Sequence, residues 1–248
     1  MSVSVPVARL EQARAVMLEL FPDGFEEAEE HDGVELVAYT DAGGEERLWS
    51  AFGGARSTDV DEGWEDAWRR FHRPVRAGPF WIGPPWEQPP PDVLVIVVDP
   101  GRAFGTGAHA TTRLSLELLA ELPREGLLDV GCGSGVLSIG AALLGFDPIV
   151  ALDVDEQARE ATERNAAANG VSIDVRVADA ALAPLPELPL AIANVSLEVV
   201  ERIAPRLESR LLVASGYLLG DEPRLPGWRR LERRDREGWA ADLFERAG

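Results

Sequence analysis

The sequence predicts an α/β protein in which a doubly wound, mostly parallel sheet follows a small N-terminal α+β module. After Pro100, short apolar runs alternate with helix-like segments, the pattern of a parallel sheet with right-handed crossovers. A proline-rich region between Pro74 and Pro100 separates this part from a shorter first part of mixed pattern. The 248 residues, 46% of them hydrophobic, suffice for one or two domains with a sizeable core.

The charge balance limits the classes of partner. The chain carries 43 acidic and 24 basic residues, a formal net charge of −19. Nonspecific nucleic-acid binding needs a surplus of Lys and Arg, so direct nucleic-acid binding is not expected. A basic protein partner fits better, although the same charge also serves plain solubility. The three histidines, His31, His72 and His109, lie too far apart for metal-ligand spacing, so no metal site is expected.

The sequence also predicts a compartment. A single cysteine, Cys132, excludes an internal disulfide. Charged residues interrupt the first twenty positions, so no signal peptide is expected. The longest apolar run in the middle of the chain, Val93 to Val98, is too short to cross a bilayer. We therefore expect a cytoplasmic protein without a membrane partner.

Residues 1–60 are predicted to form the small α+β domain. Strands are expected at Ser2 to Val7 and Gly33 to Tyr39, with a weaker one at Glu46 to Phe52. Between the first two, apolar residues from Leu10 to Leu20 fall on one face of a helix. A separate module of this kind suits substrate recognition.

Residues 61–100 are predicted to be a linker helix followed by a proline-rich connection. Trp64 to Phe71 has aromatic residues at helical spacing, which usually pack in a core or at a domain interface. The prolines that follow fix φ and remove backbone donors, so turns and extended chain are expected there. Phe80 to Ile82 and Val93 to Val98 are typical of strands that flank a turn.

Residues 101–248 carry the alternating pattern. Helices are expected at Val136 to Leu144, at Glu156 to Asn169 with Gly170 after its end, and from about Leu197. The tail predicts a closing antiparallel hairpin around Glu237-Gly238. The expected strands are Leu127 to Val130, Ile149 to Leu152, Ile173 to Val177, Leu190 to Ala193 and Leu211 to Ala214.

The stretch from Asp129 to Gly135, D-V-G-C-G-S-G, lies between a predicted strand and a predicted helix. Gly131, Gly133 and Gly135 let a ligand approach the backbone, next to the free N–H groups of the helix start. The spacing is G-x-G-x-G and not G-x-G-x-x-G, which disfavours a dinucleotide pyrophosphate. A tight strand-to-helix turn alone would use the same small residues.

Acidic residues on both sides of the glycines sharpen this prediction. Asp153 ends the next strand, where a carboxylate can accept hydrogen bonds from both hydroxyls of a ribose. Asp155 is better placed than Asp153 to cap the following helix. Asp129 could order the loop, face an ammonium group of the ligand, or form a buried salt bridge. Together these features favour an adenosyl ligand at the switch point of the sheet.

Asp129 to Gly135 together with Asp153 resembles the nucleoside-binding signature of class I S-adenosylmethionine-dependent methyltransferases. Asp99 to Thr112 resembles the F-G-T-G-x-H-x-T-T motif of ribosomal protein methyltransferases of the PrmA type. Trp64 to Arg70 is similar to that family's linker helix, and Asn194 matches its Asn at the methyl-transfer point. The resemblance covers the chain from about Asp61 onward and is thin over the first sixty residues.

The resemblance implies a seven-stranded Rossmann-like methyltransferase sheet, S-adenosyl-L-methionine as cofactor, and the stalk-base ribosomal protein L-eleven as substrate. It also implies that Thr112, Gly131, Asp153 and Asn194 contact the cofactor. Within the motif, the segment up to Thr112 is predicted to form a lid, in which glycines allow hinge motion and threonines offer hydroxyl groups. The ring of Phe104 would lie near the sulfonium of the cofactor, which its face can attract. The candidate cofactor-binding residues are therefore Phe104, Thr106, Gly107, Thr111, Thr112, Asp129, Gly131, Gly133, Gly135, Asp153 and Asn194.

Asn194 is the candidate catalytic residue. The segment Asn194-Val195-Ser196 lacks the prolines and the ring of the N-P-P-[YF] motif, which stacks on planar nitrogen substrates. An amine acceptor, α-amino or lysine, is therefore favoured, with in-line attack by the neutral amine. The simpler role for Asn194 is a cap for the next helix, and Glu198 is interpreted as part of a solvated helix face. A small-molecule methyltransferase and a noncatalytic cofactor-binding protein are the alternatives.

Overall fold

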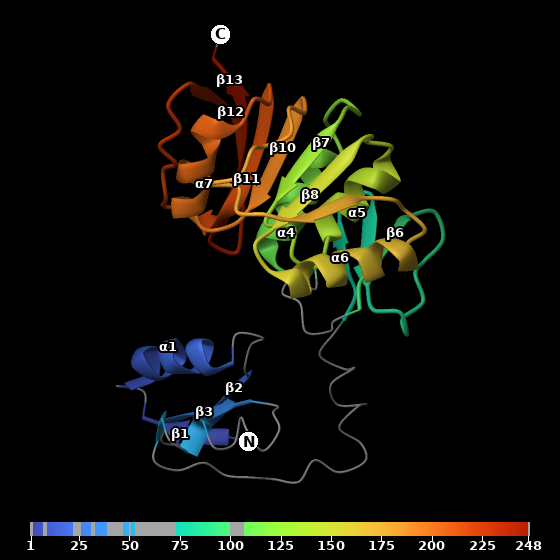
Figure 1. Ribbon diagram of the computed structural model, residues 1–248. Helices are drawn as coiled ribbons and strands as arrows, with labels where there is room; N and C mark the ends of the chain where they lie inside the picture. The colour runs from blue at the N-terminus through green and yellow to red at the C-terminus, as the bar shows by residue number, and fades with distance from the viewer. Residues whose placement is uncertain are drawn as a thin grey trace. The chain divides into compact units, whose positions relative to one another are not determined.

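The computed structural model describes residues 2–6, 9–21, 26–30, 33–38, 47–49, 51–52, 73–99 and 107–247. The chain divides into two compact units, Met1–Trp68 and Arg69–Gly248, each of which is described by itself (Figure 1). The predicted helix at Trp64 to Phe71 and the motif residues Phe104 and Thr106 lie outside the described residues.

The first unit contains a three-stranded antiparallel sheet in the order β1-β3-β2, together with helix α1. Met17 of the helix and Leu36 of the sheet are fully buried in its core. The predicted first strand, helix and Gly33 strand are confirmed, whereas β2 was not predicted. The elements are β1 (Ser2–Val5), α1 (Leu10–Leu20), β2 (Glu26–Glu30) and β3 (Gly33–Val37).

The predicted weak strand at Glu46 to Phe52 is wrong. Residues 47–49 and 51–52 are helical. Leu48 is fully buried and Phe52 packs against the same core. Residues four apart lie on one face of a helix, which explains how both side chains reach the core.

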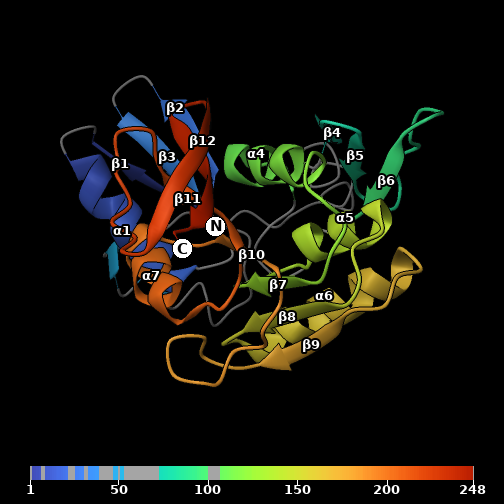
Figure 2. The same cartoon turned by 90° about the horizontal axis from the view of Figure 1, so that it is seen from above.

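The second unit is built on a seven-stranded sheet in the order β12-β13-β11-β10-β7-β8-β9. Figure 2 shows β7, β8 and β9 side by side. The strands β11, β10, β7, β8 and β9 run parallel, and β13 runs antiparallel to both of its neighbours. This arrangement confirms the predicted mostly parallel sheet and the closing hairpin. The strands are β7 (Leu127–Val130), β8 (Ile149–Asp153), β9 (Asp174–Val177), β10 (Leu190–Asn194), β11 (Leu211–Leu218), β12 (Trp228–Arg236) and β13 (Trp239–Arg246).

Helices cover both faces of this sheet. Alternate residues of a strand point to opposite faces, so Leu127 packs in the cluster with α4 and α5, whereas Leu128 packs in the cluster with α7. Helices α5, α6 and α7 confirm the predicted helices, but α4 was not predicted. The elements are α4 (Ala110–Leu119), α5 (Val136–Leu144), α6 (Glu156–Ala168), α7 (Leu197–Ile203) and the short 3-10 turn η2 (Ala204–Arg206).

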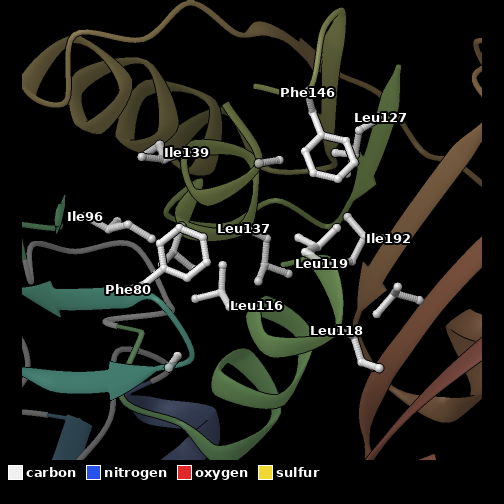
Figure 3. Packing of buried hydrophobic residues seen from close by; sticks show 14 of the residues in the cluster. Phe80, Ile96, Leu116, Leu118, Leu119, Leu127, Leu137, Ile139, Phe146 and Ile192 are labelled. Atoms are coloured by element: carbon white, nitrogen blue, oxygen red, sulfur yellow. The ribbon is translucent and has the colours of Figure 1, made fainter. Parts of the chain in front are cut away.

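The proline-rich region forms a three-stranded sheet in the order β4-β5-β6, from β4 (Val75–Ala77), β5 (Phe80–Gly83) and β6 (Leu94–Val97). The two predicted strands in this region are confirmed. Phe80 is fully buried in one cluster with Leu116 of α4 and Ile139 of α5 (Figure 3). This small sheet therefore shares the hydrophobic core of the second unit.

Phe80→Ala is expected to lower the free energy of unfolding by about 3–5 kcal/mol, because it leaves a cavity in this shared core. Urea unfolding followed by circular dichroism measures the change. Leu182→Ala is the matched control, since Leu182 is 79% exposed and its truncation should change the free energy by less than about 0.5 kcal/mol. Equal small changes in the two variants would contradict a shared core.

The C-terminal hairpin places β12 at the edge of the seven-stranded sheet. Its arginines make ion pairs with the neighbouring elements, including Arg234 with Glu121 at 2.6 Å. One arginine reaches inward, because Arg233 Nε and Nη2 both donate to the fully buried carboxylate of Asp242, each at 2.8 Å. Two parallel bonds to a buried carboxylate join β12 to β13 within the hairpin.

Candidate functional site

The candidate site lies at the carboxyl ends of neighbouring parallel strands. Strand β7 pairs with β8 on one side and with β10 on the other, so the order of the chain reverses at β7. Ligands of open α/β sheets bind outside such a switch point. Gly131, Asp153 and Asn194 lie at the ends of these three strands, so the structure brings them to the same edge of the sheet.

The glycine turn has a backbone that other residues rarely adopt. Gly131, Gly133 and Gly135 have φ angles of 77°, 54° and 80°. A Cβ atom on Gly131 would lie 2.4 Å from Cγ1 of Val195, and one on Gly135 would lie 2.7 Å from Cγ2 of Thr162. The glycines therefore serve the close packing of the turn as well as ligand access.

The carboxylate of Asp153 reaches across to the glycine turn. The Gly133 N–H donates to Asp153 Oδ2 at 2.9 Å, and the Asp155 N–H donates to Oδ1 at 3.1 Å. Each carboxylate oxygen accepts more than one hydrogen bond, so both oxygens keep capacity for ligand hydroxyls. Asp155 caps α6 by accepting from the Gln157 N–H at 2.9 Å, which confirms that Asp155, and not Asp153, is the cap.

Asp129 is fully buried at the start of the glycine turn. Its Oδ2 accepts from the Ser138 hydroxyl at 2.6 Å, and burial raises the pKa of the carboxyl to about 6. Its Oδ1 is buried without a hydrogen-bond partner in the part of the chain that the structure describes. No basic side chain among the described residues makes a salt bridge with Asp129, which leaves its other two possible roles.

Asp129→Asn is expected to remove a pH dependence of folding stability. Because the pKa of the folded carboxyl is raised from 3.8 to about 6, the unfolded chain ionises first as the pH rises. The contribution of this carboxyl to the free energy of unfolding is complete below about pH 4. It is lost as the pH rises through about 6, and the difference is about 3 kcal/mol. Urea unfolding of the free protein between pH 4 and 8 should show this slope in wild type and a flatter profile in the variant. Equal slopes would mean that Asp129 folds in its ionised form.

Thr112 and Asn194 are 82 residues apart and meet at the site. The Asn194 Nδ2 donates to Thr112 Oγ1 at 3.3 Å. Ser196, and not Asn194, is the residue that precedes helix α7 as its cap, so the alternative capping role of Asn194 is wrong. The lid interpretation is wrong for Ala110 to Thr112, because these residues form the first turn of α4 with buried side chains.

His109 is a site residue to which the sequence analysis gave no role. It caps α4, with its Nδ1 accepting from the Thr111 N–H at 3.4 Å and lying 2.7 Å from the Thr111 hydroxyl. Its ring meets Trp239 edge-on at 4.7 Å between centroids. Burial lowers the pKa of His109, against an opposing effect of Glu237, and the neutral ring keeps Nδ1 as an acceptor. Its place in the F-G-T-G-x-H-x-T-T motif was the available signal.

Two further glycines shape the surroundings of the site. Gly107 has a φ of 82°, and a Cβ there would lie 2.6 Å from Cγ2 of Ile82. Gly216, in β11, has a φ of 102°, and a Cβ there would lie 2.2 Å from the backbone oxygen of Val195. The residue after Asn194 is thus held against β11, where Ser215 O accepts from the Val195 N–H at 3.1 Å. A glycine inside a strand pattern signals such an approach.

Three further observations concern an exposed glutamate, metal binding and membrane spans. Glu198 is 82% exposed and pairs with Arg202, which confirms the solvated helix face. Within the described ranges, no group of three or more His, Cys, Asp or Glu residues is arranged to hold a metal ion. Nor does that part of the chain contain a helix both long enough and apolar enough to span a membrane.

Comparison with known proteins shows the family of the chain. A family model described as ribosomal protein L11 methyltransferase (PrmA) matches residues 16–220. The chain is similar to a ribosomal protein L11 methyltransferase of Symbiobacterium thermophilum, with 39% identity over 74% of this chain and 66% of that protein. It is also 39% identical to one of Pelobacter propionicus, over 77% of this chain and 69% of that protein.

The chain therefore spans about two thirds of the length of these two relatives. Its fold is similar to the crystal structure of a ribosomal protein L11 methylase from Lactobacillus delbrueckii subsp. bulgaricus. The two have a TM-score of 0.65 and 25% sequence identity, over 71% of this chain and 100% of the other.

Proposed function

Because the chain belongs to the ribosomal protein L11 methyltransferase (PrmA) family, we propose that it methylates amino groups of ribosomal protein L11 with S-adenosyl-L-methionine. The observation that carries this proposal is the hydrogen bond between Asn194 and Thr112 at the switch point. It joins the end of the F-G-T-G-x-H-x-T-T motif to the residue proposed at the methyl-transfer point.

The cofactor would lie over the glycine turn. Gly131, Gly133 and Gly135 would face it with backbone alone, and the Asp153 carboxylate would accept from the ribose hydroxyls. The buried Oδ1 of Asp129 lacks a donor among the described residues, and an ammonium group of the cofactor supplies one, directly or through water. The bound cofactor supplies an electrophilic methyl carbon on a sulfonium. We propose Phe104, Thr106, Gly107, Thr111 and Thr112 as its other neighbours.

Asn194 would orient the amine that accepts the methyl group. Its Nδ2 donates to Thr112, so Oδ1 is the amide atom that would accept a hydrogen bond from the amine. Only a neutral amine has a lone pair to attack with, and desolvation lowers the pKa of an α-amino group or a lysine toward neutrality. Positioning and desolvation then carry the catalysis, without an obligatory general base.

We propose that residues 1–60 recognise the substrate, that residues 61–100 connect the two parts, and that residues 101–248 bind the cofactor. The net charge of −19 supports a basic protein partner, because complementary charges speed encounter. A ribosomal protein substrate would place the activity in the cytoplasm.

The proposal is tested by incubating the protein with cofactor labelled in its methyl group and with isolated large-subunit proteins. A labelled L11 band is the expected result. A labelled metabolite from a small-molecule extract, with no labelled protein, would favour a small-molecule methyltransferase. Cofactor binding without any transfer would favour a noncatalytic protein.

A further inference from the structure

Helix α6 presents a row of polar side chains to the second unit's interior. Thr162, Asn165 and Asn169 lie three and four residues apart, so they share one face of the helix. Thr162 is fully buried and Asn165 is 5% exposed. Buried polar side chains are retained where they satisfy other buried groups, so their partners reveal what this face holds.

The first partner is the glycine turn. The Thr162 hydroxyl donates to the Gly133 carbonyl at 3.0 Å, and the Asn165 Nδ2 donates to the Ser134 carbonyl at 2.8 Å. Both carbonyls belong to the segment that would carry the cofactor. The position of α6 therefore fixes the peptide planes of this turn.

The second partner is the end of β6. The Asn169 amide pairs with both backbone groups of Val97, accepting from its N–H at 2.8 Å and donating to its carbonyl at 2.7 Å, as a neighbouring strand would. The Asn165 Oδ1 accepts from the Asp99 N–H at 3.3 Å. The chain continues from Asp99 into the F-G-T-G-x-H-x-T-T motif.

Of these three side chains, that of Asn165 hydrogen-bonds both to the glycine turn and to the chain after β6. One planar amide group holds the Ser134 carbonyl with its nitrogen and the Asp99 N–H with its oxygen. We propose that Asn165 is a positioning residue, which couples cofactor binding in the glycine turn to the chain at Asp99. When cofactor binding shifts the Ser134 peptide, the side-chain amide of Asn165 moves with it. The Oδ1 atom that accepts from the Asp99 N–H then moves as well. This inference rests on the proposed function, since it needs a cofactor in the turn.

The test follows backbone amide exchange at Asp99, by nuclear magnetic resonance, with and without S-adenosylhomocysteine. This compound is the cofactor after loss of its methyl group, so it fills the cofactor site without reacting. In wild type, saturating S-adenosylhomocysteine should slow exchange at Asp99 about tenfold, the size of one hydrogen bond tightened. In Asn165→Ala, saturating S-adenosylhomocysteine should change the exchange rate at Asp99 less than about twofold. The KM of this variant for the cofactor should rise about tenfold, while its kcat changes less.

Asn169→Ala is the matched control, because it removes a buried amide from the same face but leaves the bond to Ser134. It should speed exchange at Val97 and keep the cofactor-dependent slowing at Asp99. Asn165→Asp keeps the acceptor for Asp99 and, in its ionised form, loses the donor to Ser134. It should therefore lose only the cofactor dependence, and it carries the test if Asn165→Ala does not fold.

The coupling would be overturned if S-adenosylhomocysteine slowed exchange at Asp99 in either Asn165 variant as much as in wild type. It would also be overturned if wild type bound S-adenosylhomocysteine and exchange at Asp99 did not slow. Absence of S-adenosylhomocysteine binding to wild type, measured by calorimetry, would instead overturn the proposed function.

Discussion

Asn194→Ala is expected to lower the rate of methyl transfer by at least about a hundredfold while the affinity for S-adenosylhomocysteine falls less than about tenfold. The amide would hold the attacking nitrogen in line with the methyl carbon, and misplacing a reacting atom by about 1 Å costs about a hundredfold. The contact with the bound cofactor is one hydrogen bond among several, so its loss has the smaller effect. Single-turnover transfer of labelled methyl to L11 and calorimetry measure the two quantities.

Two variants accompany this experiment. Glu198→Ala changes an exposed side chain one turn further along and should leave the transfer rate within about twofold of wild type. Thr112→Val removes the hydroxyl that accepts from Asn194 Nδ2, so it should lower the rate in the same direction as Asn194→Ala, by a smaller factor. Full activity of Asn194→Ala would exclude the proposed role.

Asp153→Ala is expected to weaken cofactor binding about a hundredfold or more. Hydrogen bonds to a charged group contribute about 1.5–3 kcal/mol each, and the carboxylate would accept from two ribose hydroxyls. The variant also frees the Gly133 N–H, which donates to Asp153 Oδ2 at 2.9 Å, so a looser turn adds to the loss. Calorimetric titration with S-adenosylhomocysteine measures the affinity.

Asp155→Ala is the matched control for this prediction. Asp155 lies two residues further on and caps α6, so its loss should cost about 1 kcal/mol of stability and leave cofactor affinity almost unchanged. Thermal unfolding of both variants separates the two effects. If the two variants lost affinity to the same extent, the ribose assignment would be wrong.

The parallel sheet was predictable because most of its strands are largely apolar runs between helices of clear pattern. Helix α4 was not, because most of its side chains are buried, including Thr111, Leu114, Leu116 and Leu118. Its polar stripe is narrow, with Arg113 and Glu117 four residues apart, and its first turn, Ala110 to Thr112, was interpreted as part of the motif's lid. Strand β2 was missed for the opposite reason, because Glu26–Glu30 offers no apolar alternation at all.

The site was predictable in its members and less so in its connections. The glycine turn, Asp153 and Asn194 each stand in a recognisable local context. The bond between Asn194 and Thr112, the contact of His109 with Trp239 and the approach of Gly216 to Val195 join segments far apart in the sequence. Such pairs follow from the packing of the sheet, which a single sequence does not display.

The edge strand β12 has a consequence for the behaviour of the protein in solution. An unpaired strand edge is a template on which another chain can add a strand, and aggregation begins there. Here the edge strand carries Arg229, Arg230, Arg233, Arg234 and Arg236, which form ion pairs with acidic side chains, instead of the apolar run that β11 would present. The hairpin therefore protects the sheet from pairing with other chains. A chain without the hairpin would expose the edge of the apolar segment Leu211 to Ala214, where aggregation would begin.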